Sequence, residues 1–340
     1  MRRSSKLGIA TGGAISLLLL AACGGDDGAA PTATAENPPA AADDGPLTIE
    51  NCGIDVTVDN PPERAVTLNK PVTEILLALG LKDRIAAVAG EPDEYVAPQV
   101  ADDFAAVEIL VDRDYPSLEA LLDLEPDFVY ASYPSAYRDD ALGSRDNFTE
   151  LGIPTYLSVG RCENEPDDEA MDIEDIWFEI EQIGAVFGVE DAAADLVTEQ
   201  RQQLEDTLES IGELPRQSVF WWDMNTDAPF AGACCGAPAM IIETLGFENI
   251  FDDLGGHWAD TSWEQVIERD PDLIVIADFG DGDIDTKLDF LHSDPTLSQL
   301  RAVQDEAIVT LPFAATTPGI QTVTTVGTLA DAARESAAGR

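Results

Sequence analysis

Aromatic, tyrosyl and basic side chains follow several of the strands that the sequence predicts, and together they could bind a large ligand. Its apolar faces would pack on the aromatic rings, while a few donors would fix its orientation. Arginine could bind carboxylates or the oxygen shell of a ferric chelate. The candidates are Asn69, Lys70, Tyr133, Tyr137, Arg138 and Arg161 in the first half of the chain, and Trp222, Phe230, Trp258 and Phe313 in the second.

Each aromatic residue taken alone could equally be a core residue. We assign Trp177, Trp221 and Trp263 to the cores, whereas Trp222 and Trp258 are evenly balanced between core and ligand site.

Catalytic motifs are absent from the sequence. It contains no G-x-S-x-G elbow, no Walker loop and no G-x-G-x-x-G after a predicted strand. The segment GACCGAP is interpreted as a small-residue turn before a helix. Carboxylate pairs acting as acid and base, or the adjacent cysteines of that segment, are the remaining routes to an enzyme. We therefore expect a binding protein without catalytic residues.

Binding of a free metal ion is also disfavoured. The only histidines are His257 and His292, and no C-x-x-C pair is present. A site made only of carboxylate oxygens stays open, because the chain has 66 Asp and Glu residues. We expect neither a protein-bound metal nor a cofactor.

The charge balance excludes another class of partner. With 18 Lys and Arg against 66 Asp and Glu, the formal net charge is −48. Nucleic-acid phosphates need basic contacts, so nucleic-acid binding is not expected. We interpret the acidity as a solubility feature.

One helix–strand pattern occurs twice, as SLEALLDLEPDFVY at 117–130 and SWEQVIERDPDLIV at 262–275. In each copy the serine predicts a helix N-cap, the proline ends the helix, and the apolar run predicts a buried parallel strand. Glu119 and Glu264 fall in the first helical turn, where negative charge suits the helix dipole. Because helix N-termini lie at the carboxyl ends of strands, the repeat predicts two similar lobes with one of these glutamates on each rim.

Strands and helices alternate along the chain, which predicts an α/β fold with parallel, helix-covered sheets. A helix over 190–211 contains no Gly or Pro. It would be about 33 Å long, enough to connect two lobes. Residues 91–116 are acidic and predicted to be loop-rich. We expect a hairpin at 47–58, strands at 65–68, 84–88, 128–131, 154–158, 218–222, 249–251, 273–276 and 308–311, and further helices at 73–79, 147–151, 172–188, 237–245 and 323–338.

The N-terminus predicts export. Arg2, Arg3 and Lys6 precede an apolar stretch that ends in Leu-Ala-Ala-Cys at Cys23. We interpret residues 1–23 as a lipoprotein signal peptide in which Cys23 is lipidated; an ordinary signal peptide with an incidental cysteine is the alternative. Residues 24–46 are rich in Ala, Pro, Gly and Asp and predict a disordered tether.

Four further cysteines follow Cys23. Outside the cytosol an even number of cysteines predicts disulfides, and four allow three pairings. We favour Cys52–Cys162, because both fall in the first lobe. Cys234 and Cys235 would then form a vicinal bridge or stay reduced.

These segments, taken in order, resemble a known family. The set comprises the lipobox, RAVTLNKPVTEILLALGL, SLEALLDLEPDFV, LGIPTYL, the long helix, IIETLGFENIF and WADTSWEQVIERDPDLIVI. Together they are similar to the solute-binding proteins of ABC importers for iron–siderophores, haem and cobalamin, also called class III periplasmic binding proteins. The resemblance covers about residues 47–338 and implies two Rossmann-like lobes joined by one rigid helix, with the ligand in a cleft between them.

The resemblance also implies roles for particular residues. Phe230, Trp258 and the region of Tyr133 match positions that line the family's cobalamin cleft. Glu119 and Glu264 match glutamates that pair with arginines of the permease. The implied partners are an ABC permease dimer with its cytosolic ATPase.

We therefore expect a monomeric lipoprotein, anchored outside the cytoplasmic membrane, that delivers an iron(III)–siderophore complex to an ABC importer. Cobalamin and haem are the alternative ligands, and Tyr133 or Tyr137 could be the axial ligand of haem. The expected lobes span 47–188 and 214–338, and the linking helix lies within 189–213. Such a helix would limit lobe closure to small rocking.

Overall fold

The computed structural model describes residues 45–89, 95–111, 115–159, 162, 169–212, 214–280 and 282–339. The predicted signal peptide with Cys23, all of the predicted tether up to residue 44, and Arg161 lie outside these residues. Within the described ranges, no helix combines the length and hydrophobicity needed to cross a bilayer.

A β-hairpin begins the described chain, as predicted. Strands β1 (Leu47–Asn51) and β2 (Ile54–Val58) pair antiparallel. Cys52 and Gly53 form the turn with positive φ angles of 56° and 73°, as a tight two-residue hairpin turn requires. A disulfide joins Cys52 to Cys162, which is the pairing favoured from the sequence.

The first lobe contains a five-stranded parallel sheet with strand order β5-β4-β3-β6-β7. Its strands are β3 (Ala65–Leu68), β4 (Ile85–Ala89), β5 (Ile109–Val111), β6 (Phe128–Ala131) and β7 (Thr155–Leu157). Its helices are α1 (Lys70–Ala78), α2 (Ala101–Phe104), α3 (Leu118–Leu122) and α4 (Arg145–Glu150). The stretch 91–116, predicted to be loop-rich, also contains α2 and β5, elements too short to show a periodic pattern.

The second lobe contains a six-stranded mixed sheet, β11-β9-β8-β12-β13, with β10 paired to β8. Its strands are β8 (Ser218–Met224), β9 (Phe230–Gly232), β10 (Glu248–Asn249), β11 (Trp258–Asp260), β12 (Leu273–Asp278) and β13 (Ile308–Pro312). Its helices are α7 (Ala237–Thr244), α8 (Trp263–Arg269), α9 (Asp283–Ser293) and α10 (Arg301–Gln304). Strands β8, β12, β13 and β10 are parallel, whereas β9 and β11 join antiparallel.

The two copies of the repeated pattern occupy equivalent places. Ser117 caps α3 by accepting a hydrogen bond from the Ala120 amide, and Ser262 caps α8 in the same way. The strand that follows each helix is internal to its sheet, since β6 lies between β3 and β7 and β12 lies between β8 and β13. The prediction of two similar lobes is therefore confirmed.

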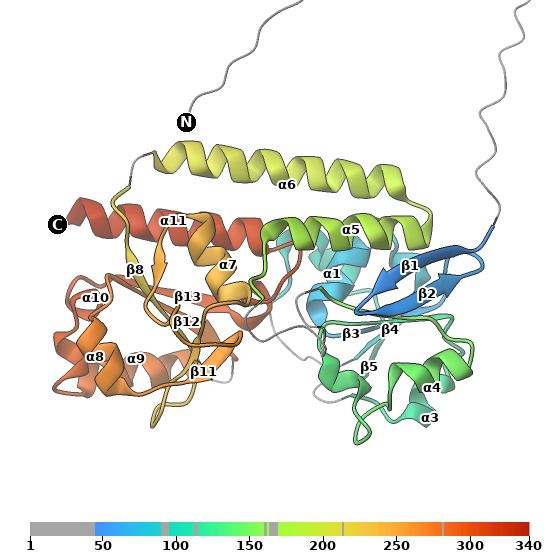
Figure 1. Cartoon of the computed structure of the whole chain (residues 1–340), viewed down its shortest axis with the longest axis horizontal. Helices are drawn as coiled ribbons and strands as arrows, with labels where there is room; N and C mark the ends of the chain where they lie inside the picture. The colour runs from blue at the N-terminus through green and yellow to red at the C-terminus, as the bar shows by residue number, and fades with distance from the viewer. Residues whose placement is uncertain are drawn as a thin grey trace, which may run out of the picture. The chain divides into compact units, whose positions relative to one another are not determined.

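One long helix, α6 (Glu190–Ile211), joins the lobes as predicted, and it lies beside α5 (Ile173–Phe187) and α11 (Thr322–Gly339). Helix α6 has the predicted bounds and packs on both α5 and α11, so that it extends over the two lobes (Figure 1). Gln200 of α6 joins the two sides. Its amide oxygen accepts from the Trp177 indole at 2.9 Å, and its amide nitrogen donates to the Ile320 carbonyl at 3.4 Å.

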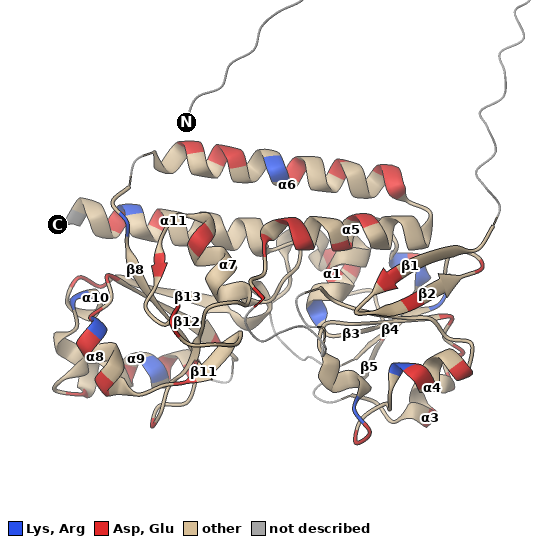
Figure 2. Cartoon of the chain, viewed as in Figure 1, with Lys and Arg blue, Asp and Glu red and all other residues tan. Residues whose placement is uncertain are grey.

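Acidic residues outnumber basic ones over both lobes and along α6 (Figure 2). The apolar residues predicted for the inner stripe of α5, including Ile176, Ile180 and Ile183, are buried. Charge on the outside and apolar side chains inside are what a water-exposed body needs.

Candidate ligand site

Aromatic rings from both lobes meet where the carboxyl ends of the two sheets approach each other. Tyr133 follows β6, and its ring stacks on Phe313 at a centroid distance of 6.5 Å. Phe313 follows β13 and stacks in turn on Phe279, which follows β12, at 4.4 Å. The hydroxyls of Tyr133 and Thr317 are 2.9 Å apart and share a hydrogen bond. We call Tyr133, Phe279 and Phe313 the aromatic junction.

The aromatic junction presents apolar surface to solvent. Phe279 is 41% exposed, although a phenylalanine normally buries most of its surface. Tyr133 and Phe313 are half-buried. Exposed rings beside a lobe boundary could pack against a large ligand.

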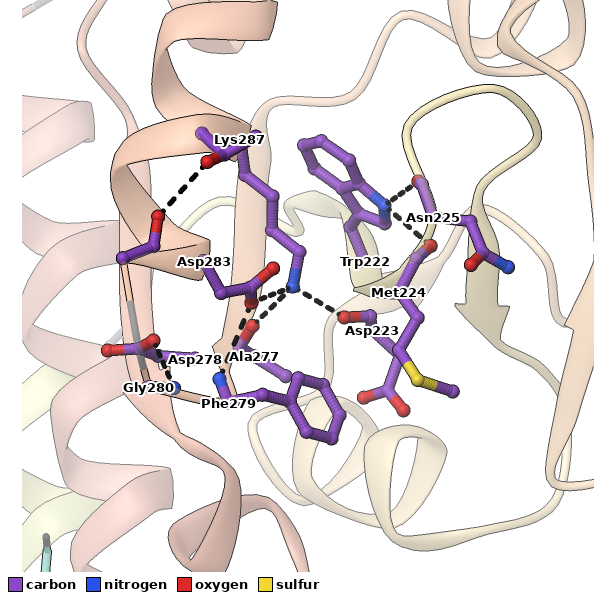
Figure 3. Close-up of polar contacts among 12 residues, drawn as sticks. Trp222, Asp223, Met224, Asn225, Ala277, Asp278, Phe279, Gly280, Asp283 and Lys287 are labelled. Carbon is purple, nitrogen blue, oxygen red and sulfur yellow. Dashed lines mark hydrogen bonds and ion pairs between the residues drawn. The ribbon is translucent and has the colours of Figure 1, made fainter. Parts of the chain in front are cut away.

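A buried lysine lies directly beneath Phe279. Lys287 of α9 donates to the carbonyl oxygens of Asp223 and Ala277 at 2.6 and 2.7 Å, and to the Asp283 carboxylate at 2.6 Å (Figure 3). These carbonyls belong to the next-to-last residues of β8 and β12, so one ammonium group links α9 to the carboxyl ends of two strands. Its Nζ also lies 5.2 Å from the centroid of the Phe279 ring.

The local backbone around Phe279 is held by the same acidic residues. The Asp283 carboxylate accepts a long hydrogen bond from the Phe279 amide, at 3.4 Å, and the Asp278 carboxylate accepts from the Gly280 amide at 2.9 Å. Figure 3 shows these contacts between the end of β12 and the start of α9. The cluster therefore fixes the position from which Phe279 projects.

A second apolar surface lies on β8, β9 and β11. Met224, which is 40% exposed, is paired with Phe230, and Phe230 is paired with Asp260. Side chains two residues apart on a strand share a face, so Trp258 lies on the same face as Phe230. Phe230 and Trp258 are half-buried, as a residue at the edge of a ligand site would be.

The prediction that Trp222 could line the ligand site is wrong. Its side chain is fully buried, and its indole nitrogen donates to the carbonyl oxygens of Met224 and Asn225 at 2.9 and 2.8 Å (Figure 3). A register shift between Trp222 and Met224 interrupts the alternation of the strand. The irregularity turns Trp222 to the core face and Met224 to the other face. On the core face, the ring centroids of Trp222 and Trp263 are 4.9 Å apart.

Two further predicted ligand contacts need correction. Lys70 is 1% exposed and donates to the Tyr95 carbonyl at 2.8 Å, inside the first lobe. Tyr137 is 7% exposed, and its hydroxyl lies 3.3 and 3.2 Å from the carbonyl oxygens of Val129 and Tyr156. Burial raises the pKa of Tyr137 above its usual value, so this phenol stays protonated near neutral pH. Neither side chain reaches a surface at which a large ligand could bind.

The remaining residues that the sequence proposed for the ligand site are Arg138, Arg161 and Asn69. Arg138 is exposed and pairs with Asp140 at 3.1 Å. Arg161 lies outside the described residues. Asn69 is buried and has the positive φ angle of 83° at the start of α1.

Sequence reasoning missed Met224, Phe279 and Lys287. The first two directly end or follow strands, so the rule that selected Tyr133 and Phe313 would also have selected them. For Lys287 the available signal was its spacing from Asp283, four residues along one helix.

The return segment before α11 carries a polar contact between the lobes. Gln321 donates from its amide nitrogen to both carboxylate oxygens of Glu74, at 3.0 and 2.8 Å, and both residues are buried. The Ala97 amide also donates to Glu74, at 2.8 Å. This pairing joins α1 of the first lobe to the start of α11.

Glu179 of α5 is a buried carboxylate below the carboxyl end of β7. It accepts hydrogen bonds from the hydroxyls of Tyr130 and Ser158 and from the Val159 amide. Burial raises the pKa of Glu179 to about 7, although these hydrogen bonds act in the opposite direction. The group therefore titrates near neutral pH.

Glu119 and Glu264 are both exposed in the first turns of their capped helices. Among the described residues no group of three or more His, Cys, Asp or Glu has the geometry of a metal site. Cys234 and Cys235 are joined as a vicinal disulfide in the segment before α7.

A family model described as periplasmic binding protein matches residues 66–315, most of the chain. The chain belongs to the periplasmic binding protein family. The family is one of substrate-binding proteins and not of enzymes, which agrees with the absence of catalytic motifs from the sequence.

Individual relatives of this periplasmic binding protein carry more specific names. A vitamin B12-binding protein of Vibrio campbellii is 27% identical over 219 residues, 64% of this chain and 72% of the relative. An uncharacterised ABC transporter substrate-binding lipoprotein of Bacillus subtilis, YvrC, is 28% identical over 243 residues, 68% of this chain and 69% of the relative. A solved structure from Saccharomonospora viridis, described as an ABC-type Fe3+-hydroxamate transport system, superposes with a TM-score of 0.73 at 26% identity, covering 84% of this chain and 98% of that one.

Proposed function

We propose that this periplasmic binding protein captures an iron(III)–siderophore complex outside the cytoplasmic membrane and delivers it to an ABC permease. The observation that carries the proposal is the aromatic junction, with Phe279 exposed beside rings from both lobes. The likeness to the Saccharomonospora protein with its Fe3+-hydroxamate description supports the choice of ligand.

The chemistry of the junction suits such a complex. A ferric siderophore presents an organic shell around an oxygen-rich iron centre. The rings of the aromatic junction and the Met224 side chain would pack on the shell. Arg138, exposed in the loop after Tyr133, would donate to ligand oxygens. Arg161, which follows the strand predicted at 154–158, is proposed from the sequence as a second donor to ligand oxygens.

Cobalamin is the second candidate, because the Vibrio campbellii relative is named for vitamin B12. A corrin ring would use the same apolar contacts with fewer charged ones. Haem would require an axial ligand, for which Tyr133 is the remaining candidate now that Tyr137 is buried.

Delivery would use the exposed pair Glu119 and Glu264, one on each lobe, which would contact arginines of the permease dimer. Lipidation of Cys23 would hold the monomeric body near that permease, and the cytosolic ATPase would drive import. Burial of the ligand between lobes that α6 keeps at a nearly fixed spacing would provide affinity without a wide hinge motion.

Quenching of tryptophan fluorescence by a ferric hydroxamate siderophore tests the ligand assignment. Replacing Phe279 with alanine should weaken binding by about tenfold or more, since a buried phenylalanine side chain contributes roughly 1.5–3 kcal/mol. Phe178→Ala is the matched control, because Phe178 is 53% exposed on α5, away from the aromatic junction. Equal affinities of the two variants, or absence of binding by the unaltered protein, would contradict the proposal.

A further inference from the structure

The first lobe has a cavity that the proposed siderophore site does not include. It has a volume of about 190 Å³, well above the ~30 Å³ that a water molecule occupies in the liquid. Its walls come from the β1–β2 hairpin, the loop after β6, the start of α4 and the end of β7. Arg145, the first residue of α4, lines it.

Arg145 is a buried cation that forms no ion pair with any residue that the structure describes. Its residue is 7% exposed, and the oxygens that accept its hydrogen bonds among the described residues are all uncharged. Asp146 also lines the cavity, but it is exposed to water. Burial lowers the pKa of Arg145, which is the direction expected when a charge loses hydration. A buried charge of this kind is stabilised when an opposite charge binds beside it.

Four of the five N–H donors of the Arg145 guanidinium make hydrogen bonds within the first lobe. Nε donates to the Thr155 hydroxyl, Nη1 to the Asn51 carbonyl, and Nη2 to the Asn51 side-chain oxygen and the Thr155 carbonyl, at 2.8 to 3.1 Å. A guanidinium group has five N–H donors, so one hydrogen on Nη1 has no acceptor within the described residues. The four bonds hold the group rigidly, and rigid donors bind an anion at low entropic cost.

A second donor stands at the same cavity. Ser144 precedes α4, and its hydroxyl makes no hydrogen bond with any described residue, not even as a helix cap. Apart from the carboxylate of Asp146, the rest of the wall is mainly apolar and includes Ile54, Leu157 and the ring of Tyr137. The Arg145 guanidinium lies 5.9 Å from the centroid of that ring. One end of the cavity can therefore bind negative charge while the remainder accepts hydrocarbon.

From this arrangement we infer that the cavity binds a small organic carboxylate with a short aliphatic tail. The carboxylate accepts from Nη1 of Arg145 and from the Ser144 hydroxyl, and the tail contacts Ile54 and Leu157. Such a ligand would pack against Pro134, which is the next residue after Tyr133 of the aromatic junction.

Saturation-transfer difference NMR with sodium propionate and the full chain tests the inference. The ionic strength is held constant, because a net charge of −48 repels anions in a salt-dependent way. We expect transfer to the propionate methyl group, and none to propionamide, which has the same shape without the charge. Equal transfer to both compounds would overturn the inference.

Variants locate the signal without depending on Arg145, whose removal could unfold the lobe. Ile54→Phe fills the cavity and should abolish transfer. Ile109→Phe, the matched control on the edge strand β5, is 49% exposed outside the cavity and should leave transfer unchanged. Ser144→Ala should weaken binding about tenfold, the loss that corresponds to ~1.4 kcal/mol. Persistence of the signal in Ile54→Phe would show that propionate binds elsewhere and would refute the site.

Discussion

Lys287 offers the sharpest test of how the second lobe positions Phe279. Its ammonium group is 2% exposed and makes three hydrogen bonds of 2.6 to 2.7 Å, two of them to main-chain carbonyls. Methionine in its place would keep the length and apolar packing but would remove a donor from both carbonyls. A buried polar group that loses its partner costs about 1–3 kcal/mol.

The net effect of Lys287→Met is smaller than the sum of these losses. Removing a buried charge recovers part of its desolvation penalty. The Asp283 carboxylate is 31% exposed, so water can replace the lysine there. We therefore expect the free energy of unfolding to fall by about 2–4 kcal/mol.

Urea denaturation followed by tryptophan fluorescence measures this loss, because Trp222 lies 5.7 Å from the Lys287 ammonium. Lys82→Met is the matched control. Lys82 pairs with Asp103 at 2.7 Å, but both side chains are 40% or more exposed, and such pairs contribute less than about 1 kcal/mol. Equal stabilities of the two variants would refute the assignment of Lys287 as the link between α9 and the sheet.

Three further changes have defined outcomes. The folded-state pKa of Glu179 is raised from 4.5 to about 7. Protonation therefore stabilises the fold fully below pH 4.5, and this contribution of about 3 kcal/mol disappears as the pH rises to 7. Glu179→Gln should flatten the dependence of unfolding free energy on pH in urea titrations, and an unchanged dependence would contradict the account. Replacing Cys52 and Cys162 with serine should lower the free energy of unfolding by about 2–5 kcal/mol, because the bridge spans 110 residues. The same change at Cys234 and Cys235 should lower it much less, and equal losses would exclude the explanation by loop length. Charge reversal of Glu119 and Glu264 to lysine should abolish cellular uptake but leave siderophore affinity intact, and normal uptake would exclude docking through this pair.

The sequence was sufficient for features that depend on local signals. Helix α6 has the predicted bounds because a long run of residues without Gly or Pro favours one continuous helix. The serine caps and the internal strands of the repeat follow from residue types at fixed spacing. The short strand β5 had no such signal, and only pairing with β4 defines it.

The site was less predictable because it depends on register and on long-range partners. An irregularity in the pairing of β8 with β9 places Trp222 and Met224 on opposite faces of the strand, and no periodic pattern in the sequence reveals it. Tyr137 looked available as a donor, but carbonyls from two strands take up its hydroxyl. Tyr133 and Phe313 follow strands as expected, although their mutual stacking appears only in three dimensions.

Native mass spectrometry of the purified protein with equimolar ferric hydroxamate siderophore, haem and cobalamin tests the central claim most directly. We predict a dominant one-to-one complex with the ferric siderophore, which should decrease in Phe279→Ala. Preferential retention of cobalamin or haem, or no complex with any of the three, would contradict the assignment of an iron(III)–siderophore ligand.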